Sequence, residues 1–295
     1  MIKVVWIGPL DDNFGLKFHY EYLIDDLLKL SKINIHWIDS SLPDGQRVSL
    51  DKCLVVFSSD SRVLDTKLCN YFKQCYEDGN KFILIHTSNE QLNHNSDYYN
   101  YAEHVFRCYL GYEYLNKDNI SILPIGYQTG FKRLKEIVSF KDKQYSCNFI
   151  GHPKNERYAL INVINRIKDS FVHTTTKWNC PTQLSKEQMS DVMAKSLVTP
   201  IPMGNVHIET HRLYESLEAG SIPVVRTYGD LNYYKLLFGD NPLPTVASWE
   251  ELPEVILRFS DENTYNNKVK EIQDWYENLK KSTSENIVRQ AAKLV

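Results

Sequence analysis

The chain lacks an excess of charge of either sign, and it lacks any long apolar run. Its 34 Lys and Arg residues nearly balance 37 Asp and Glu residues, which gives a formal net charge of −3. A nucleic-acid coat or a polybasic membrane anchor needs a clear surplus of basic residues. A membrane-spanning helix needs about 20 consecutive apolar residues, and the apolar run that opens the chain is far shorter. We therefore expect neither a nucleic-acid partner nor a membrane span.

Glycine, proline and paired cysteine are also scarce. With 12 Gly and 11 Pro in 295 residues, the chain is not a fibrous or low-complexity protein. The six cysteines include no Cys-x-x-Cys pair, which is typical of free thiols in a reducing compartment, so we expect a cytoplasmic protein. The length suits two domains of about 130–150 residues each.

Short apolar runs alternate with helical patterns along the chain. Strands are expected at 3–7, 33–38, 53–57, 82–86, 105–110 and 120–125, and again at 145–150, 171–175, 197–201 and 221–225. Helices are expected at 16–30, 62–76, 155–168, 186–195 and 210–219, with two more after residue 249. Strands separated by helices predict an α/β fold of parallel sheets that are covered on both faces.

A basic, polar stretch interrupts this alternation in mid-chain. We therefore predict an N-terminal α/β domain at 1–130, a linker at 131–144, a second α/β domain at 145–275 and a C-terminal helix at 276–295. Ligands of open parallel sheets bind beyond the carboxyl ends of the strands. Functional residues are thus expected in the loops that follow strands, in both halves.

Several common catalytic motifs are absent from the sequence. It contains no GxGxxG, no GxxxxGK[ST], no HExxH and no GxSxG, and it lacks the Asp-x-Asp pair that would hold a divalent cation against a diphosphate. His207 and His211 are the one histidine pair worth weighing as metal ligands, and a third ligand is not evident, so we favour polar or supporting roles for them. We expect a reaction that uses no metal or other cofactor and forms no covalent enzyme intermediate.

The stretch 196–225 is the most informative, because it reads as a strand, a glycine-containing loop, a helix, a tight turn and a strand. Thr210 is placed to cap the helix, and Arg212 lies in its first turn. A helix N-terminus and a guanidinium both favour a phosphate, and Glu215, one turn later, can accept hydrogen bonds from a vicinal diol such as ribose. The alternative is that Arg212 and Glu215 form an ion pair on a surface helix.

A second anion site is predicted where the strand at 145–150 ends. Gly151 follows the strand, and Arg157 falls at the start of the next helix. Backbone N–H groups beside one arginine would again suit a phosphate. The alternative for Arg157 is a solvated helix face.

Residues 210–224 resemble the signature of exostosin-family glycosyltransferases, S-x-R-x-x-E-A-L-x-x-G-x-I-P-V. The chain reads THRLYESLEAGSIPV there, with Thr210 in place of Ser and Ser216 in place of Ala. Pro202-Met203-Gly204 resembles the family's P-x-G, and FIG at 149–151 followed by Arg157 resembles its strand–Gly–Arg element. Looser similarity to short members covers HTSNE at 86–90, VFR at 105–107 and PIGY at 124–127. Secretory exostosins begin with a membrane anchor, and a compact version without one is similar to those encoded by large viruses of algae.

This resemblance implies a GT-B architecture: two facing Rossmann-like domains with a cleft between them, and C-terminal helices that cross back to the first domain. It implies inverting, metal-independent transfer of a sugar from a nucleoside-diphosphate donor to a glycan acceptor. Xylose, galactose, glucuronic acid and arabinose are donor sugars in this family, and the residues do not select among them; UDP-xylose is the working choice. By matched position, the diphosphate would be bound by Arg157, Arg212, Gly151 and Thr210, the ribose by Glu215, and further donor or acceptor contacts would come from Gly204, His211 and Tyr127.

Inversion also requires a general base that takes the proton of the acceptor hydroxyl. Glu90 is the preferred candidate, because it follows the predicted strand 82–86 at its carboxyl end. The alternatives are Asp12, Asp60, His86 and Asp97. Arg107 is expected to brace the first sheet, and Trp178 and Tyr127 are read as core or interdomain aromatic residues.

Two other functions remain open at this point. The chain could be a non-catalytic subunit that binds a sugar nucleotide or a glycan, or it could be a nucleotide-sugar epimerase of the same fold. Release of free nucleotide that is enhanced by the acceptor would indicate the transferase. Binding without release would indicate the subunit, and isomerisation of the donor would indicate the epimerase.

Overall fold

The computed structural model describes residues 3–8, 18–29, 35–38, 48–58, 62–93, 96–177 and 180–295. Contacts between Cα atoms divide the chain into two compact units. Unit 1 comprises Met1–Thr129 together with Lys280–Val295, and unit 2 comprises Gly130–Leu279. The predicted linker 131–144 lies within unit 2.

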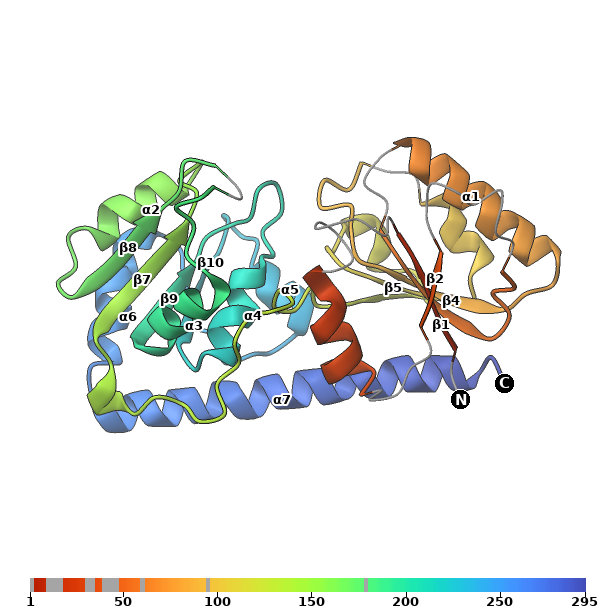
Figure 1. Cartoon of the computed structure of the whole chain (residues 1–295). Coiled ribbons are helices and arrows are strands. Elements are labelled where there is room, and N and C mark those ends of the chain that lie inside the picture. The colour runs from red at the N-terminus through yellow and green to blue at the C-terminus, as the bar shows by residue number, and fades with distance from the viewer. Residues whose placement is uncertain are drawn as a thin grey trace. The chain divides into compact units, whose positions relative to one another are not determined.

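Unit 1 is built on a six-stranded sheet with the order β2-β1-β3-β4-β5-β6, in which every neighbouring pair is parallel (Figure 1). Its strands are β1 (Lys3–Ile7), β2 (Ile35–Ile38), β3 (Cys53–Phe57), β4 (Phe82–His86), β5 (His104–Arg107) and β6 (Ile120–Ile122). Its helices include η2 (Tyr22–Leu27), α1 (Arg62–Glu77), η3 (Asp97–Tyr101) and η4 (Tyr112–Tyr114).

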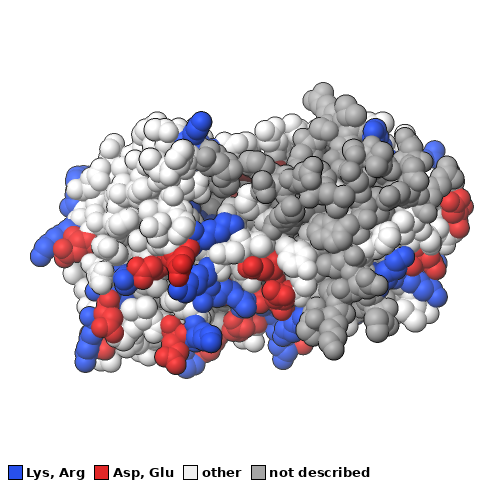
Figure 2. All heavy atoms as spheres, in the orientation of Figure 1, with Lys and Arg blue, Asp and Glu red and all other residues white. Residues whose placement is uncertain are grey.

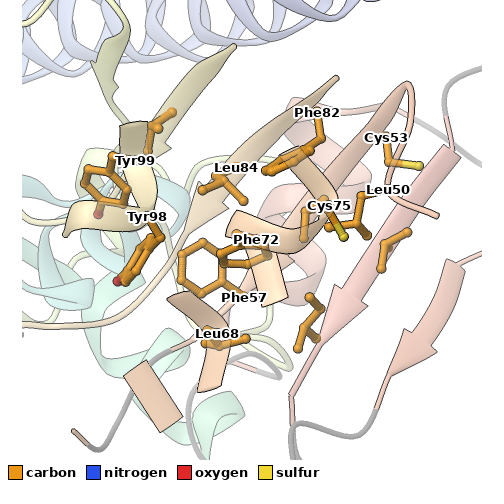
Figure 3. Packing of buried hydrophobic residues seen from close by; sticks show 14 of the residues in the cluster. Leu50, Cys53, Phe57, Leu68, Phe72, Cys75, Phe82, Leu84, Tyr98 and Tyr99 are labelled. Atoms are coloured by element: carbon orange, nitrogen blue, oxygen red, sulfur yellow. The ribbon is translucent and has the colours of Figure 1, made fainter. Parts of the chain in front are cut away.

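The core of unit 1 lies between the sheet and α1. All residues of β3 and β4 are buried, which is why both strands read as continuous apolar runs rather than as alternating patterns. Alternate residues point to opposite faces, and on the α1 face the ring of Phe72 packs against Phe57 at 5.3 Å and against Phe82 at 5.8 Å (Figure 3). Near the end of this unit, Gly126 has φ +69°, and a Cβ there would lie 2.1 Å from the ring of Tyr22, so the position requires glycine.

Unit 2 is built on a five-stranded parallel sheet with the order β11-β10-β9-β7-β8. Its strands are β7 (Tyr145–Gly151), β8 (Ser170–Thr174), β9 (Ser196–Ile201), β10 (Ile222–Arg226) and β11 (Thr245–Val246). The chain starts at β7, adds β8 on one side and then continues with β9 on the other. The strand order therefore reverses between β7 and β9, and ligands of doubly wound sheets bind at such a switch point.

The helices of unit 2 connect these strands. They are η5 (Phe140–Asp142), α2 (Arg157–Ile164), α3 (Lys186–Ala194), α4 (His211–Glu218), α5 (Tyr233–Phe238), η6 (Trp249–Glu251) and α6 (Leu252–Arg258). Helix α4 ends in a Schellman motif, in which Ser221 N–H donates to Ser216 O at 3.0 Å and Gly220 N–H donates to Leu217 O at 3.2 Å. Gly220 has φ +67°, and Ile137 closes over it so that a Cβ would meet Ile137 Cγ2 at 2.9 Å.

The last helix, α7 (Glu262–Ala292), has 31 residues and contributes to both units, with its residues up to Leu279 in unit 2 and those from Lys280 in unit 1. Its buried side includes Tyr265, Ile272, Tyr276 and Ile287. Its exposed side carries ion pairs such as Lys270–Asp274 at 2.6 Å, and Figure 2 shows basic and acidic side chains interspersed along it. No helix in the described part of the chain is both long and apolar enough to span a membrane.

The structure confirms the predicted α/β class and most of the predicted strands. The strands expected at 3–7, 53–57 and 82–86 coincide with β1, β3 and β4. The helix expected at 155–168 is shorter, because α2 ends at Ile164 and the chain then turns through Asp169, whose φ is +55°. Helix α5 and strand β11 were not predicted. The predicted C-terminal segment 276–295 is the second half of a helix that already begins at Glu262.

Candidate functional site at the strand ends of unit 2

The carboxyl ends of β7 and β9 carry the residues that the sequence singles out for anion binding. Thr210 caps α4, and its Oγ1 accepts a hydrogen bond from Arg212 N–H at 3.0 Å. The Arg212 side chain reaches across to the end of β7, where Nη2 donates to Ile150 O at 3.3 Å. The N-terminus of α4 is thereby held beside the end of β7, at the switch point of the sheet.

Arg212 also forms an ion pair with Glu215, its neighbour one turn along α4. Nη1 donates to Glu215 Oε2 at 2.5 Å, and the side chains are 22% and 2% exposed respectively. The two residues thus form the i,i+3 pair considered above, but Glu215 is buried rather than on a surface face. Glu215 fixes the guanidinium while Arg212 still reaches solvent.

Arg157, the first residue of α2, binds the loop that follows β9. Its Nε and Nη2 donate to Met203 O at 3.1 and 2.8 Å, and its Nη1 donates to His152 O at 3.2 Å. A Cβ placed on Gly151 would lie 3.8 Å from Arg157 Nη1, so the guanidinium passes close to the end of β7. The two arginines are therefore crossed: each begins on one loop of the switch point and binds a carbonyl of the other.

Glu156, which the sequence did not single out, joins three loops at this edge. Its Oε1 accepts from Met203 N–H at 2.7 Å and from the Tyr228 hydroxyl at 2.6 Å. Its Oε2 accepts from Arg226 Nη1 at 2.7 Å, with the carboxylate 10% exposed. Burial, together with the hydrogen bond to Glu156, raises the pKa of Tyr228, so its hydroxyl stays protonated. Glu156 and Arg157 hold both backbone groups of Met203, which fixes the loop before α4.

The remaining predicted contacts lie in or next to that loop. Gly204 is buried, and its N–H donates to His207 O at 2.7 Å. His207 is also buried, with Nδ1 accepting from Glu209 N–H at 3.1 Å. His211 is the first residue of α4 and is half-buried. Among the residues that the structure describes, no three His, Cys, Asp or Glu side chains come together as a metal site.

In unit 1, Glu90 lies in the loop after β4 and is half-buried. Asp97, another candidate base, is the first residue of η3. His86 is fully buried, and both of its ring nitrogens make hydrogen bonds, to the Tyr99 hydroxyl at 2.6 Å and to Ser88 Oγ at 3.1 Å. Asp12, Asp60 and Trp178 lie outside the described residues.

Tyr127 and Arg107 are interior residues of unit 1. Tyr127 is 1% exposed, and its ring packs edge-on against Tyr22 at 5.7 Å. Arg107 ends β5, is 0% exposed and donates from Nε to Cys108 O at 3.0 Å. Their burial accounts for both as parts of the core.

Comparison with known families identifies the chain. The family described as RXYLT1 C-terminal domain matches residues 127–293, which is more than half of the sequence. The chain belongs to the RXYLT1 C-terminal domain family. The matched residues include the whole of the candidate site at the carboxyl ends of β7 and β9, whereas most of unit 1 precedes them. None of the matches described here names the exostosin family, so that likeness remains one of motifs.

Curated relatives with this domain carry the name ribitol-5-phosphate xylosyltransferase 1. The zebrafish (Danio rerio) protein is 32% identical over 134 residues, which is 40% of this chain and 30% of that protein. The Homo sapiens protein is 29% identical over 133 residues, 39% of this chain and 30% of the relative. The matched part therefore spans about a third of the length of these relatives.

Solved structures that resemble the whole chain include two that are named as glycosyltransferases. An α1,3-fucosyltransferase superimposes with a TM-score of 0.56 at 11% identity, covering 98% of this chain and 91% of that one. AviGT4, from avilamycin A biosynthesis, gives a TM-score of 0.55 at 12% identity, covering 100% and 98%. Anabaena HepE, solved with UDP and glucose, gives 0.53 at 11% identity, covering 99% and 100%. The chain has the GT-B glycosyltransferase fold, as the motif resemblance implied.

Proposed function

We propose that this protein is an inverting, metal-independent glycosyltransferase that uses a nucleoside-diphosphate sugar. The observation that carries the proposal is the pair of crossed arginines at the switch point of unit 2, in a chain with the GT-B fold. Arg157 and Arg212 each stand in the first turn of a helix, where the helix dipole also favours an anion.

In the proposed donor site, these groups bind the diphosphate. Arg212 is oriented by Glu215, and Thr210 and Gly151 flank the position of the phosphates. Glu215, through its carboxylate, also accepts hydrogen bonds from the ribose. When the glycosidic bond breaks, negative charge develops on the leaving diphosphate, and two guanidinium groups with preorganised N–H donors stabilise it. This arrangement assigns to the protein the role that a divalent cation would otherwise fill.

The sugar is proposed to be xylose, carried by UDP. The support is the name of the curated relatives, ribitol-5-phosphate xylosyltransferase 1, and the UDP in the HepE structure. The same name supports an acceptor that carries ribitol 5-phosphate. Gly204 and His211, on the loop and first turn that precede Arg212, are proposed to contact the donor.

Glu90 is the proposed general base. As the acceptor hydroxyl attacks the anomeric carbon, Glu90 takes its proton, the bond to the diphosphate breaks, and UDP leaves with the electron pair. Attack on the face opposite the leaving group inverts the anomeric configuration. A base of this kind contributes typically about 10²–10⁴-fold to the rate.

The test is a panel of UDP- and GDP-sugars incubated with the protein in EDTA, with and without ribitol 5-phosphate as acceptor, while free nucleotide is measured. We expect UDP release from UDP-xylose that is enhanced by the acceptor and unaffected by the chelator. Release that vanishes in EDTA would refute metal independence. Binding without release would indicate a non-catalytic subunit, and isomerisation of the donor would indicate an epimerase.

A further inference from the structure

A row of three residues, two of them polar, crosses the sheet of unit 1 at its carboxyl edge. The strand register pairs Phe57 with His86 and His86 with Arg107, so the last residues of β3, β4 and β5 lie side by side. The ring of His86 stacks on Phe57 at 4.5 Å with an angle of 11° between the planes. Tyr99, from η3, packs edge-on against His86 at 5.9 Å. A histidine and an arginine therefore occupy core positions in this row.

These residues form a directional chain of hydrogen bonds. Arg107 Nη1 donates to the Tyr99 hydroxyl oxygen at 3.1 Å. Burial raises the pKa of Tyr99, so the hydroxyl keeps its own hydrogen, and the partner in reach is His86 Nδ1 at 2.6 Å. With Nδ1 accepting, the neutral ring carries its hydrogen on Nε2, which donates to Ser88 Oγ at 3.1 Å. The chain thus runs from Arg107 through Tyr99 and His86 to Ser88.

The guanidinium of Arg107, at the start of this hydrogen-bond chain, is buried. Arg107 is 0% exposed, and in the part of the chain that the structure describes its Nη2 has no hydrogen-bond partner and no carboxylate pairs with it. Its charge is met by the carbonyls of Cys108 and Tyr109, at 3.0 and 3.1 Å from Nε, and by the ring of Tyr114, 4.3 Å from Cζ. A buried cation that has no counter-ion among its described neighbours is costly.

The other end of the hydrogen-bond chain, Ser88, lies in the loop that carries Glu90. Thr87, Ser88 and Asn89 are buried, at 2%, 8% and 6% exposure, and Glu90 is the first residue of the loop with substantial exposure. Asn89 has a φ of +70°, which asparagine adopts more readily than most residues, whereas the φ of +55° at Leu92 is unusual for a bulky side chain. Backbone strain of this kind persists only where the surroundings impose it, and it is concentrated at functional sites.

We propose that Tyr99, His86 and Arg107 are positioning residues, whose hydrogen-bond chain holds the loop after β4 so that the Glu90 carboxylate is fixed for proton transfer. The inference rests on the proposed function, because the hydrogen-bond chain can position a catalytic group only if Glu90 is the base. It also gives His86 a different role from the alternative considered above: His86 acts as a neutral link inside the protein and does not touch the acceptor.

The experiment compares Tyr99→Phe with Tyr98→Phe. Both tyrosines lie in η3 and are buried, but only the Tyr99 hydroxyl belongs to the chain described here. We expect Tyr99→Phe to lower kcat for UDP-xylose turnover by about 10-fold or more, since small displacements of catalytic groups have effects of this size. The KM for the donor and the Kd for UDP should stay unchanged, and amide hydrogen exchange should accelerate at residues 87–93. Tyr98→Phe should keep the wild-type kcat.

A double-mutant cycle that combines Tyr99→Phe with Glu90→Gln decides whether the hydrogen-bond chain acts through Glu90. In the Glu90→Gln background, Tyr99→Phe should cause no further loss of kcat. Multiplicative losses in the double variant would overturn the inference and leave Glu90 as the base. So would wild-type kcat in Tyr99→Phe, or an equal loss in Tyr98→Phe. Full activity of Glu90→Gln alone is a different result: it refutes Glu90 as the base, and the proposed positioning role falls with it.

Discussion

Arg107 and Arg212 both stand at the carboxyl edge of a parallel sheet, one in each unit, and they differ in what surrounds the charge. Arg107 is 0% exposed and is enclosed by carbonyls and aromatic rings. The Arg212 side chain is 22% exposed, is paired with Glu215 and begins a helix. A guanidinium that reaches solvent beside a helix N-terminus can meet a ligand, whereas a sealed one can only orient its neighbours.

This comparison separates two uses of the same side chain. We propose that the edge of unit 2 presents charge to an incoming anion, and that the edge of unit 1 uses charge internally to hold a loop. The only acid proposed for chemistry in unit 1, Glu90, is partly exposed. The predictions below test this division, starting with the largest expected effect.

Glu90→Gln should lower kcat by at least about 100-fold, because the amide cannot accept the acceptor's proton. The Kd for UDP should not change, since the donor site is proposed to lie in unit 2. Steady-state turnover of UDP-xylose and calorimetric titration with UDP give the two quantities. If Glu90→Gln turned over normally, the base would have to be sought among Asp12, Asp60 and Asp97.

Arg212→Ala should weaken UDP binding by about 100-fold, which corresponds to the loss of charge-assisted hydrogen bonds worth about 1.5–3 kcal/mol each. Arg212→Lys should fall between this variant and the wild type, because it keeps the charge but loses the planar fork. Calorimetric titration measures both.

The matched control is Arg166→Ala, which removes an arginine of unit 2 whose partner Glu250 is exposed, with side chains 63% and 67% exposed. It should bind UDP as the wild type does. Because Arg212→Ala leaves the buried Glu215 without its cation, thermal denaturation should accompany the titration. Unchanged UDP affinity in a folded Arg212→Ala protein would show that UDP does not bind at the carboxyl edge of the sheet of unit 2.

Glu156→Gln should weaken UDP binding by about 10-fold and lower Tm, because Arg226 loses its carboxylate and the loop before α4 loses part of its anchor. Glu250→Gln is the control, since the exposed Arg166–Glu250 pair contributes at most about 1 kcal/mol. Titration with UDP and thermal denaturation follow both variants. Equal behaviour of the two would mean that Glu156 does not organise the site.

The smallest effect concerns His104, at the other end of β5 in unit 1. Burial, aided by Lys293 and Arg289 of the C-terminal segment, lowers its pKa to about 4. The unfolded chain therefore binds a proton between pH 6.5 and about 4 that the folded chain refuses, so stability falls as the pH falls through this window. Between pH 7 and 5.5 the loss should be roughly 1 kcal/mol.

His104→Gln should remove this contribution, so that its free energy of unfolding depends less on pH than that of the wild type. Urea denaturation at pH 7 and at pH 5.5 measures the difference. Parallel pH dependences of the two proteins would show that His104 is not protonated on unfolding.

The sequence predicted the strands that are buried on both faces, and it predicted the starts of the helices at which anion binding is proposed. Strand β3 is a run of five apolar residues, and Thr210, Arg212 and Glu215 fall within six consecutive residues, so local spacing was enough. Helix α5 and strand β11 were not predicted. Helix α5 spans only Tyr233–Phe238, and β11 has two residues. Elements this short have little periodicity to detect.

The contacts that organise both edges could not be read from spacing. Glu156 meets partners 47 to 72 residues away, at Met203, Arg226 and Tyr228. The link between His86 and Arg107 depends on the register of β4 against β5 and on a tyrosine from η3. The one available signal in the sequence was Arg107, a single arginine in an apolar strand. It predicted a residue that braces the sheet, but not the hydrogen bonds that link Arg107 to Tyr99 and His86.

Helix α7 belongs partly to unit 1 and partly to unit 2, and this division limits the order in which the two units can fold during synthesis. Unit 1 comprises the first 129 residues and the segment Lys280–Val295, so this half cannot be completed during synthesis until that segment has left the ribosome. Unit 2 has all its residues available earlier and can fold first. Cutting the chain at residue 279 would therefore damage unit 1, and the two units cannot be expressed separately by a single division of the sequence.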